Sequence, residues 1–368
     1  MSLFILALTS YNHSKYNLRS EVCSRFQTDF LVEDYATYYP TLSRSADNCA
    51  IPQYDETTDS TNALKVLNYL RYLNGLQDTS IDNSKREDVC KCAAYMLQNN
   101  DVSHTPSSSK KCYSSEAYTG CSKSNLNRLQ FKATSATSVM YYYWDEGVST
   151  LGHRLHVTRQ NLLKTTFCGA IYDEQGSTYQ AMGVNLYRGI SQKNPNIIAV
   201  PPPGPVPLHI LQYQSFAGHK SGNWLTWFSV SGQNYDKDKP GKVEVWNDFK
   251  KLDISYETLE KQLNIYYTTK YKFNSGGFES NKLYWIKYTN GDYEYRYWTY
   301  PTDCDFQVAD SEIDRLLQLQ PECMMDGCER PFDPPIQPDN PDVNKTTDNN
   351  STNNNNNPDP ANPNNLFA

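Results

Sequence analysis

Two short segments of the chain carry imidazole and carboxylate side chains at places where helices are expected to end. The first segment runs from Ser103-His104-Thr105-Pro106 to Glu116, and the second runs from Glu146 to Gly152-His153-Arg154. Side chains in such loops lie at the rim of a scaffold, where they can meet a ligand. Imidazole beside carboxylate binds divalent metals such as zinc and also supports proton transfer near neutral pH. The candidate site residues are therefore His104, Glu116, Glu146 and His153, with His104 and His153 as the metal ligands.

Each candidate also has a structural interpretation. His104 and His153 can be turn histidines that hydrogen-bond a helix end, and Glu116 and Glu146 can be solvated carboxylates, as most acidic residues are. His156 is more simply explained as a packed histidine. The sequence contains no His-Glu-x-x-His helix, no Gly-x-Ser-x-Gly elbow and no glycine-rich phosphate loop after a strand. The motifs alone do not say whether the protein is an enzyme.

Composition narrows the class of partner. The chain has 368 residues, 41 acidic against 34 basic residues and a net charge of -7, so it lacks the basic footprint of a duplex nucleic-acid binder. Its mean hydropathy is -0.72. No apolar run reaches the roughly 18 residues of a transmembrane helix. We expect no nucleic-acid partner and no transmembrane helix.

The cysteines indicate the compartment. Ten cysteines are scattered along the chain without a pair of Cys-x2-Cys motifs, which favours disulfides in an oxidising compartment over a zinc ribbon. Reduced, buried cysteines are the alternative. Spacing does not give the connectivity, although Cys112 and Cys121 bracket a short loop and are a candidate pair. We expect a secreted or extracellular protein. The alternative is an extracellular protein that stays associated with the cell surface.

The two ends of the chain agree with export. Residues 1–10 hold a short apolar run followed by small residues, which predicts a short or truncated signal segment, with a buried strand as the alternative. Residues 11–59 are expected to be an N-terminal lead. From residue 331 the chain is rich in Asn and Pro, which predicts a disordered tail over 331–368. Glycosylation sequons begin there at Asn344, Asn349 and Asn350.

Apolar spacing predicts helices before strands in the first part of the chain. Residues 60–100 should form two helices, the first capped by Ser60 or Thr61 and ended by Gly75, and the second opened by a Ser84/Glu87 capping box. A third helix is expected over Ser135–Glu146. Strands are expected at Gly169–Asp173 and Tyr179–Tyr187, with a turn at Gly176. Helices followed by strands predict an α+β domain.

A proline-rich segment, Pro201-Pro202-Pro203-Gly204-Pro205, precedes a region of alternating aromatic and polar residues. Tyr284–Tyr288 and Tyr293–Tyr297 flank Asn290-Gly291, which is a strong hairpin signal. Trp224–Val230 and Val243–Trp246 are further expected strands. We therefore predict a small antiparallel β-sheet domain over residues 208–305, packed as a sandwich and rich in Tyr and Trp, followed by a cysteine-containing extension over 306–330.

The ordered motifs of the first region resemble the CAP superfamily, which includes cysteine-rich secretory proteins, antigen 5 and plant pathogenesis-related proteins, in its bacterial and protist form (SCP-like extracellular domains). The segments that carry the resemblance are Asn68-Tyr69-Leu70-Arg71, Asn74-Gly75-Leu76, Ala93-Ala94, Ser103–Pro106, Glu116, Tyr143–Glu146, Gly152–Arg154 with Asn161-Leu162, Cys168-Gly169 and Pro202-Pro203-Gly204. The resemblance covers residues 60–207. It departs from the family at Ser115, where Gly is usual, at Ala117, where Asn is usual, and at Trp144, which sits one position late.

The resemblance implies an α-β-α sandwich whose central cleft is lined by His104, Glu116, Glu146 and His153. It further implies a secreted binding module, with a divalent cation such as zinc in the cleft and a sterol, a lipid, or a host-surface protein or glycan as partner. A second hypothesis is a metal-dependent, protease-like hydrolase in which Glu116 or Glu146 is the general base. A third is an adhesin whose aromatic β domain binds a partner surface, because aromatic side chains are enriched at interfaces.

Overall fold

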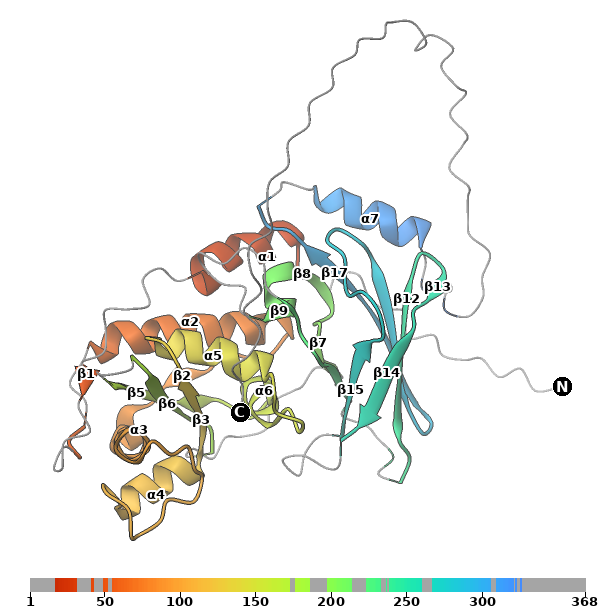
Figure 1. Ribbon diagram of the computed structural model, residues 1–368. Coiled ribbons are helices and arrows are strands. Elements are labelled where there is room, and N and C mark those ends of the chain that lie inside the picture. The colour runs from red at the N-terminus through yellow and green to blue at the C-terminus, as the bar shows by residue number, and fades with distance from the viewer. Residues whose placement is uncertain are drawn as a thin grey trace, which may run out of the picture. The chain divides into compact units, whose positions relative to one another are not determined.

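The computed structural model of the chain describes residues 17–31, 41–42, 49–51, 55–172, 176–185, 197–213, 223–232, 236, 238–259, 267–305, 309–320, 322 and 325 (Figure 1). The expected signal segment, the glycosylation sequons and the tail over 331–368 lie outside these residues, as do Cys323 and Cys328. All the described residues belong to one compact unit.

The three helices expected in the first region are present, two of them with a different starting point. The α-helices are α1 (Arg19–Arg25), α2 (Glu56–Leu73), α3 (Arg86–Asn99), α4 (Ser115–Ser122), α5 (Ser135–Trp144), α6 (Gly152–Thr158) and α7 (Asp310–Leu319). Helix α2 begins before the expected Ser60 or Thr61, because the Asp55 carboxylate accepts a hydrogen bond from the Thr58 N–H (3.1 Å). Helix α5 begins at Ser135 as predicted, and it ends at Trp144 because Asp145 adopts a left-handed conformation (φ 51°).

The expected capping box at Ser84 and Glu87 is wrong. Asp82, and not Ser84, accepts the capping hydrogen bond, from the Ser84 N–H (3.0 Å). That bond opens a 3-10 turn over Asn83–Lys85, and α3 follows from Arg86. Residues with short polar side chains compete for such positions, so sequence alone does not choose between neighbours.

A four-stranded sheet lies between two helical layers. Its order is β1 (Thr41–Leu42), β5 (Phe167–Tyr172), β6 (Thr178–Gly183) and β3 (Ser124–Leu129), antiparallel except for the parallel β1–β5 pair. Because side chains alternate along a strand, Phe167 joins the cluster of α2 and α5 while Cys168 and Ala170 join the cluster of α3 and α4. Figure 1 shows α2 and α5 on one side of this sheet and α3 and α4 on the other.

Four disulfides link the described cysteines. They join Cys23 to Cys304, Cys49 to Cys112, Cys90 to Cys168 and Cys92 to Cys121. The candidate pair Cys112–Cys121 is therefore wrong, because the buried Cys121 on α4 faces Cys92 on α3 and leaves Cys112 to the N-terminal segment. The disulfides confirm a cysteine-rich, cross-linked protein.

Two further sheets form the second region. One has the order β14 (Ile254–Thr258), β15 (Tyr267–Phe273), β11 (Phe228–Gly232) and β7 (Ile197–Val200). The other has the order β13 (Lys250–Lys251), β12 (Gly241–Asn247), β16 (Tyr284–Asn290), β17 (Tyr293–Thr302) and β8 (Gly204–Pro207). Two short ladders join β9 (Gln212–Tyr213) to β10 (Asn223–Trp224) and β2 (Ser80–Ile81) to β4 (Lys164–Thr165).

The predicted boundary between residues 207 and 208 needs correction. Strands β7 and β8 precede it, yet β7 pairs with β11 and β8 pairs in parallel with β17. The β region therefore starts by Ile197, and it is mixed and not purely antiparallel. The predicted hairpin is present, although Asn290 pairs with Tyr293, so the turn consists of Gly291-Asp292.

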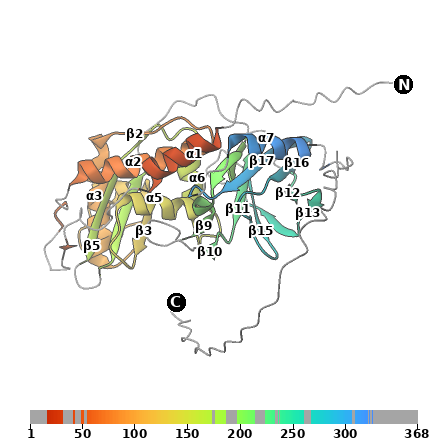
Figure 2. The same ribbon diagram turned by 90° about the horizontal axis from the view of Figure 1, so that it is seen from above.

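One hydrophobic cluster runs through both regions. It contains Leu67 of α2 and Val139 of α5 together with Val230 of β11, Val245 of β12 and Ile286 of β16. The predicted lead also joins this unit, because Arg19 of α1 donates to Thr302 Oγ1 (2.6 Å) and Cys23 is bonded to Cys304. Among the described residues, no helix is both long and apolar enough to cross a membrane. The fold is mixed α+β; Figure 2 shows the same elements from above.

Candidate functional site

His153, a residue of the predicted site, forms a hydrogen-bonded pair with Asp145. Asp145 ends α5, and its carboxylate reaches the first turn of α6, where Oδ1 lies 2.8 Å from His153 Nδ1 and Oδ2 accepts from the Arg154 N–H (3.1 Å). The side chain of Asp145 is 1% exposed and that of His153 is 24% exposed. Because a carboxylate only accepts hydrogen bonds, His153 donates from Nδ1, and Nε2 is the nitrogen left for a ligand; in the neutral ring it is an acceptor.

Arg154 serves the structure and not the ligand. Its guanidinium is buried and donates to the carbonyl oxygens of Tyr143 (2.7 Å), Trp144 (2.6 Å) and Trp227 (2.8 Å). The first two bonds hold the end of α5, and the third reaches the segment that leads into β11. Burial lowers the pKa of Arg154, and the nearby charge of Asp145 opposes that shift. Arg154 therefore fixes the position of the Asp145–His153 pair against the β region.

His104 is held against the last turn of α4. Its Nδ1 lies 2.9 Å from the carbonyl oxygen of Cys121, and Asn125 of β3 donates to the carbonyl oxygen of His153 (3.2 Å). Both histidines are therefore attached to residues 121–125. Since a carbonyl only accepts, His104 also donates from Nδ1, and its Nε2 is an acceptor in the neutral ring.

His156 completes a histidine cluster made of His104, His153 and His156. Burial is the main cause that lowers the pKa of His156 to about 3, and electrostatic interactions with Arg159, His153 and His104 act in the same direction. Arg159 lies within reach of the His156 ring, with 3.4 Å between Arg159 Nη1 and His156 Nδ1. His156 is thus the neutral, half-buried member, in agreement with its interpretation as a packed histidine.

Among the described residues, the carboxylate of Glu116 is paired with Lys91 of α3. Glu116 is in the first turn of α4, where Ser114 caps the helix by accepting from the Ala117 N–H (3.1 Å), and its carboxylate lies 3.4 Å from Lys91 Nζ. Hydrogen bonds from its own N–H and from Ser114, and then the charge of Lys91, lower the pKa of Glu116 to about 2. Glu116 acts here as a helix-start carboxylate.

Glu146 points to the β region. Its Oε1 accepts a hydrogen bond from the Thr226 N–H (2.8 Å), so the carboxylate that meets His153 belongs to the preceding residue, Asp145. The sequence did not single out Asp145 as a site residue. The only signal for it was that this acidic residue directly precedes the expected Glu146. The left-handed conformation of Asp145 decides which of the two side chains turns toward α6.

The described donors do not fit a metal ion in this arrangement. No group of three or more His, Cys, Asp or Glu side chains in the described part of the chain is placed to hold one. Glu116 forms an ion pair with Lys91, and Glu146 accepts a hydrogen bond from Thr226. Of the four predicted residues, only the imidazoles of His104 and His153 remain as candidate metal ligands. Catalytic zinc sites usually have three protein ligands, so the zinc expectation finds no complete ligand set among these residues.

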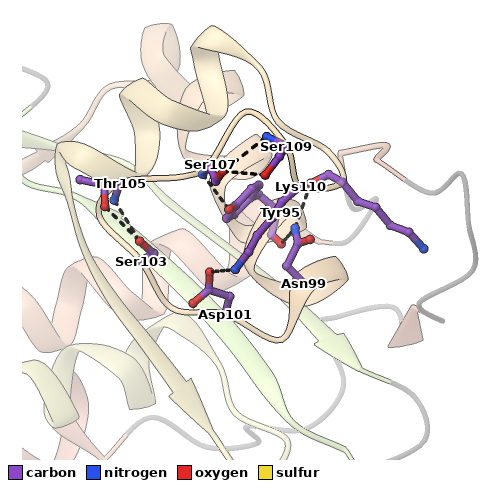
Figure 3. Close-up of polar contacts among 9 residues, drawn as sticks. Tyr95, Asn99, Asp101, Ser103, Thr105, Ser107, Ser109 and Lys110 are labelled. Atoms are coloured by element: carbon purple, nitrogen blue, oxygen red, sulfur yellow. Dashed lines mark hydrogen bonds and ion pairs between the residues drawn. The ribbon is translucent and has the colours of Figure 1, made fainter.

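The loop over residues 101–112 contains a Ser-x-x-Lys spacing at Ser107 and Lys110 that could indicate a nucleophile and its base. Figure 3 shows that the two side chains have other partners. Lys110 Nζ lies 2.5 Å from Asp101 Oδ2, and Ser107 Oγ lies 2.9 Å from Ser109 Oγ. The hydrogen bond to Asp101 raises the pKa of Lys110, which is the wrong direction for a base. This loop therefore forms no Ser–Lys catalytic pair.

Comparison with known proteins adds no relative. No protein-family model matches the chain, and no curated protein matches it. The fold and the site define a disulfide-linked α+β protein with a histidine cluster at the edge of its four-stranded sheet. Its function must be argued from that arrangement.

Proposed function

We propose that this chain is a secreted protein of the CAP type that acts as a non-catalytic binding module through its histidine cluster. The motif order over residues 60–207 supports the family, and a sheet between two helical layers agrees with the sandwich that the family implies. The four disulfides support an oxidising, extracellular location.

The observation that carries the proposal is the orientation of two imidazole rings. His104 and His153 each use Nδ1 for a bond inside the protein, and within the described residues neither Nε2 has a hydrogen-bond partner. No serine, threonine or cysteine in that part of the chain bonds to either ring, so a nucleophile–base pair is missing. Two oriented acceptors without a nucleophile favour binding over catalysis.

Such acceptors suit a ligand that brings a hydrogen-bond donor. A sterol or lipid hydroxyl, which the family resemblance suggests, can donate to Nε2. Polar groups of this kind fix the orientation of a ligand whose remaining surface is apolar. The proposed ligand class is therefore an apolar molecule with one hydroxyl group.

The test uses a fluorescent sterol and the purified full-length protein. We expect saturable binding that weakens at least about tenfold in both His104→Ala and His153→Ala, the change that one lost hydrogen bond of about 1.4 kcal/mol produces. Lys164→Ala, a charge change at an exposed ion pair with Asp82, is the control and should bind as the wild type does. If neither histidine variant changes sterol binding, the cluster is not the binding site.

A second candidate function rests on the Asp145–His153 pair. A buried carboxylate 2.8 Å from Nδ1 orients an imidazole and strengthens Nε2 as a general base, which would activate water in a hydrolase. Turnover of a chromogenic ester or peptide panel, removed by His153→Gln and reduced by Asp145→Asn, would favour this alternative. Turnover that survives His153→Gln would exclude it.

A further inference from the structure

Residues 145–151, called here the joining segment, connect α5 to α6 and set the geometry of the histidine site. Asp145 at its start binds the His153 ring, and Leu151 at its end directly precedes α6, which contains His153. Two backbone hydrogen bonds close successive turns in it, from the Val148 N–H to the Asp145 carbonyl (3.3 Å) and from the Leu151 N–H to the Val148 carbonyl (3.1 Å). The placement of His153 on Asp145 therefore depends on the shape of the joining segment.

The backbone of the joining segment has a shape that local preferences do not favour. Asp145 (φ 51°), Gly147 (φ 79°) and Leu151 (φ 52°) are all left-handed. Glycine adopts this conformation freely and aspartate tolerates it, whereas the Cβ of a leucine approaches its own backbone too closely there. The middle of the segment is exposed at Gly147, Ser149 and Thr150, so packing does not hold this part. Contacts from elsewhere in the protein must keep the segment in shape.

Two such contacts come from the β region. The Thr226 N–H donates to Glu146 at the start of the joining segment (2.8 Å), and Lys270 Nζ of β15 donates to the Ser149 carbonyl (3.0 Å). Ser149 lies inside the second turn, the one that leads directly into α6. Thr226 contributes a backbone group, so of these two contacts only the one from Lys270 depends on a side chain of the β region.

The ammonium group of Lys270 is fixed on the side of the β region. The side chain is 5% exposed, and Nζ lies 3.1 Å from Glu257 Oε2 of β14 and 4.5 Å from the centroid of the Trp227 ring. A buried charge is costly unless it is paired and hydrogen-bonded, so the carboxylate of Glu257 and the carbonyl of Ser149 both stabilise it. Because these partners converge on one nitrogen atom, Nζ carries the position of the sheet to Ser149.

We propose that Lys270 is a positioning residue of the histidine cluster. By holding the Ser149 carbonyl, it fixes the second turn of the joining segment and, through that turn, the orientation of the His153 ring on Asp145. The β region is thus part of the machinery of the candidate site. The consequence for ligand affinity rests on the sterol-binding function proposed above, whereas the orientation of His153 does not.

The orientation of His153 can be measured directly. A neutral imidazole carries one proton, either on Nδ1 or on Nε2. The hydrogen bond to Asp145 keeps the proton of His153 on Nδ1. A loosened joining segment would let the ring spend part of its time with the proton on Nε2, which then cannot accept a hydrogen bond from a ligand hydroxyl. Nitrogen-15 NMR of the imidazole distinguishes the two forms.

The experiment compares Lys270→Met with Lys272→Met in the full chain. Lys272 is an exposed residue of the same strand, and its Nζ lies 5.0 Å from the same Trp227 ring, so Lys272→Met removes a lysine from that ring and leaves the bond to Ser149 in place.

Spectra are recorded at about pH 8.5, where an ordinary histidine is neutral. We expect the form of His153 with its proton on Nε2 to appear in Lys270→Met and not in Lys272→Met. His104 is an internal control, because it is bonded to the carbonyl of Cys121 and not to the joining segment, so its signals should stay unchanged. The affinity for the fluorescent sterol should fall about fivefold in Lys270→Met alone.

Val245→Ala separates positioning from a general loss of stability. Val245 is 0% exposed in the core and lies on β12, outside the joining segment. Its truncation should lower the thermal midpoint and leave the signals of His153 as in the wild type. The proposal is overturned if Lys270→Met does not change the signals of His153, or if Lys272→Met or Val245→Ala changes them as much.

The two readouts also separate positioning from sterol binding. If the signals of His153 change in Lys270→Met but the wild type binds no sterol, the proposed function fails and the positioning role of Lys270 stands. If the wild type binds sterol and Lys270→Met binds it equally well despite changed signals, the effect of Lys270 on the ligand is overturned.

Discussion

Asp145 Oδ1 lies 2.8 Å from His153 Nδ1, and the other oxygen of the same buried carboxylate accepts the Arg154 N–H, so one side chain both orients a ring and starts α6. Its left-handed conformation (φ 51°) turns the carboxylate back over the next helix. The relationship makes Asp145 a structural requirement for any function of the histidine cluster.

We predict that Asp145→Asn lowers the free energy of unfolding by about 2–3 kcal/mol, since hydrogen bonds to a buried charged acceptor are among the strong ones. Asparagine tolerates the left-handed conformation, so the loss reports the charge and not backbone strain. Urea unfolding gives the value. His153→Gln, which keeps a side-chain donor, is the control and should cost less; an equal or larger cost would mean that the pair is not what stabilises this turn.

The protein should lose stability in acid partly through His156. The pKa of His156 is about 3 in the folded protein against 6.5 for an ordinary histidine, because burial disfavours its charged form. Between these values the unfolded chain binds a proton that the folded chain does not, so its contribution is complete above pH 6.5 and is lost as the pH falls toward 3. The slope is at most about 1.4 kcal/mol per pH unit.

His156→Gln should remove that part of the slope, because glutamine stays neutral and can still accept from Arg159. The measurement is the free energy of unfolding in urea for both proteins at several pH values below neutrality. The remaining titratable groups are the same in the two proteins, so their contributions cancel in the difference between the two free energies of unfolding. If the free energy of unfolding depends on pH in the same way in both proteins, the pKa of His156 is not lowered by folding.

The disulfides should open in order of their exposure. Cys49 is exposed and Cys112 is half-buried, whereas Cys90, Cys168, Cys92 and Cys121 are each 0% exposed. Because a reducing thiolate must reach a sulfur atom, limited reductant should open Cys49–Cys112 first. Alkylation followed by peptide mass spectrometry gives the order. Early labelling of Cys90 or Cys168 would contradict the buried position of the α3–β5 link.

Gly120→Ala should prevent α4 from packing on α3. A methyl group at Gly120 would overlap the backbone carbonyl of Asp88, and a backbone group cannot move aside as a flexible side chain can. We expect a loss of about 3 kcal/mol or more, as for severe overpacking, seen as a lower midpoint in thermal unfolding. Gly152→Ala has only Thr150 Oγ1 nearby, at 3.5 Å, and is the control. A similar midpoint in both variants would rule out the close approach of the two helices.

Local signals in the sequence were sufficient for the main elements of the first region. The apolar spacing that predicts α2, α3 and α5 depends on neighbours three or four residues away, and a helix makes its own hydrogen bonds within that distance. The hairpin of β16 and β17 is equally local. Cap positions were less accurate, because Asp55 and Asp82 compete with nearby Ser and Thr for the same role.

The sequence by itself determined which residue types were available for a site, and it determined the helices and the hairpin that carry them. Only the tertiary structure decided the partners of those residues. Glu146 accepts a hydrogen bond from Thr226, which is 80 positions away in the sequence. Cys121 forms its disulfide with Cys92 and not with the nearer Cys112. Strands β7 and β8 likewise belong to sheets completed by distant strands. The physical reason is that a side chain's partner depends on which distant segments fold against it, and residue spacing carries no information about them.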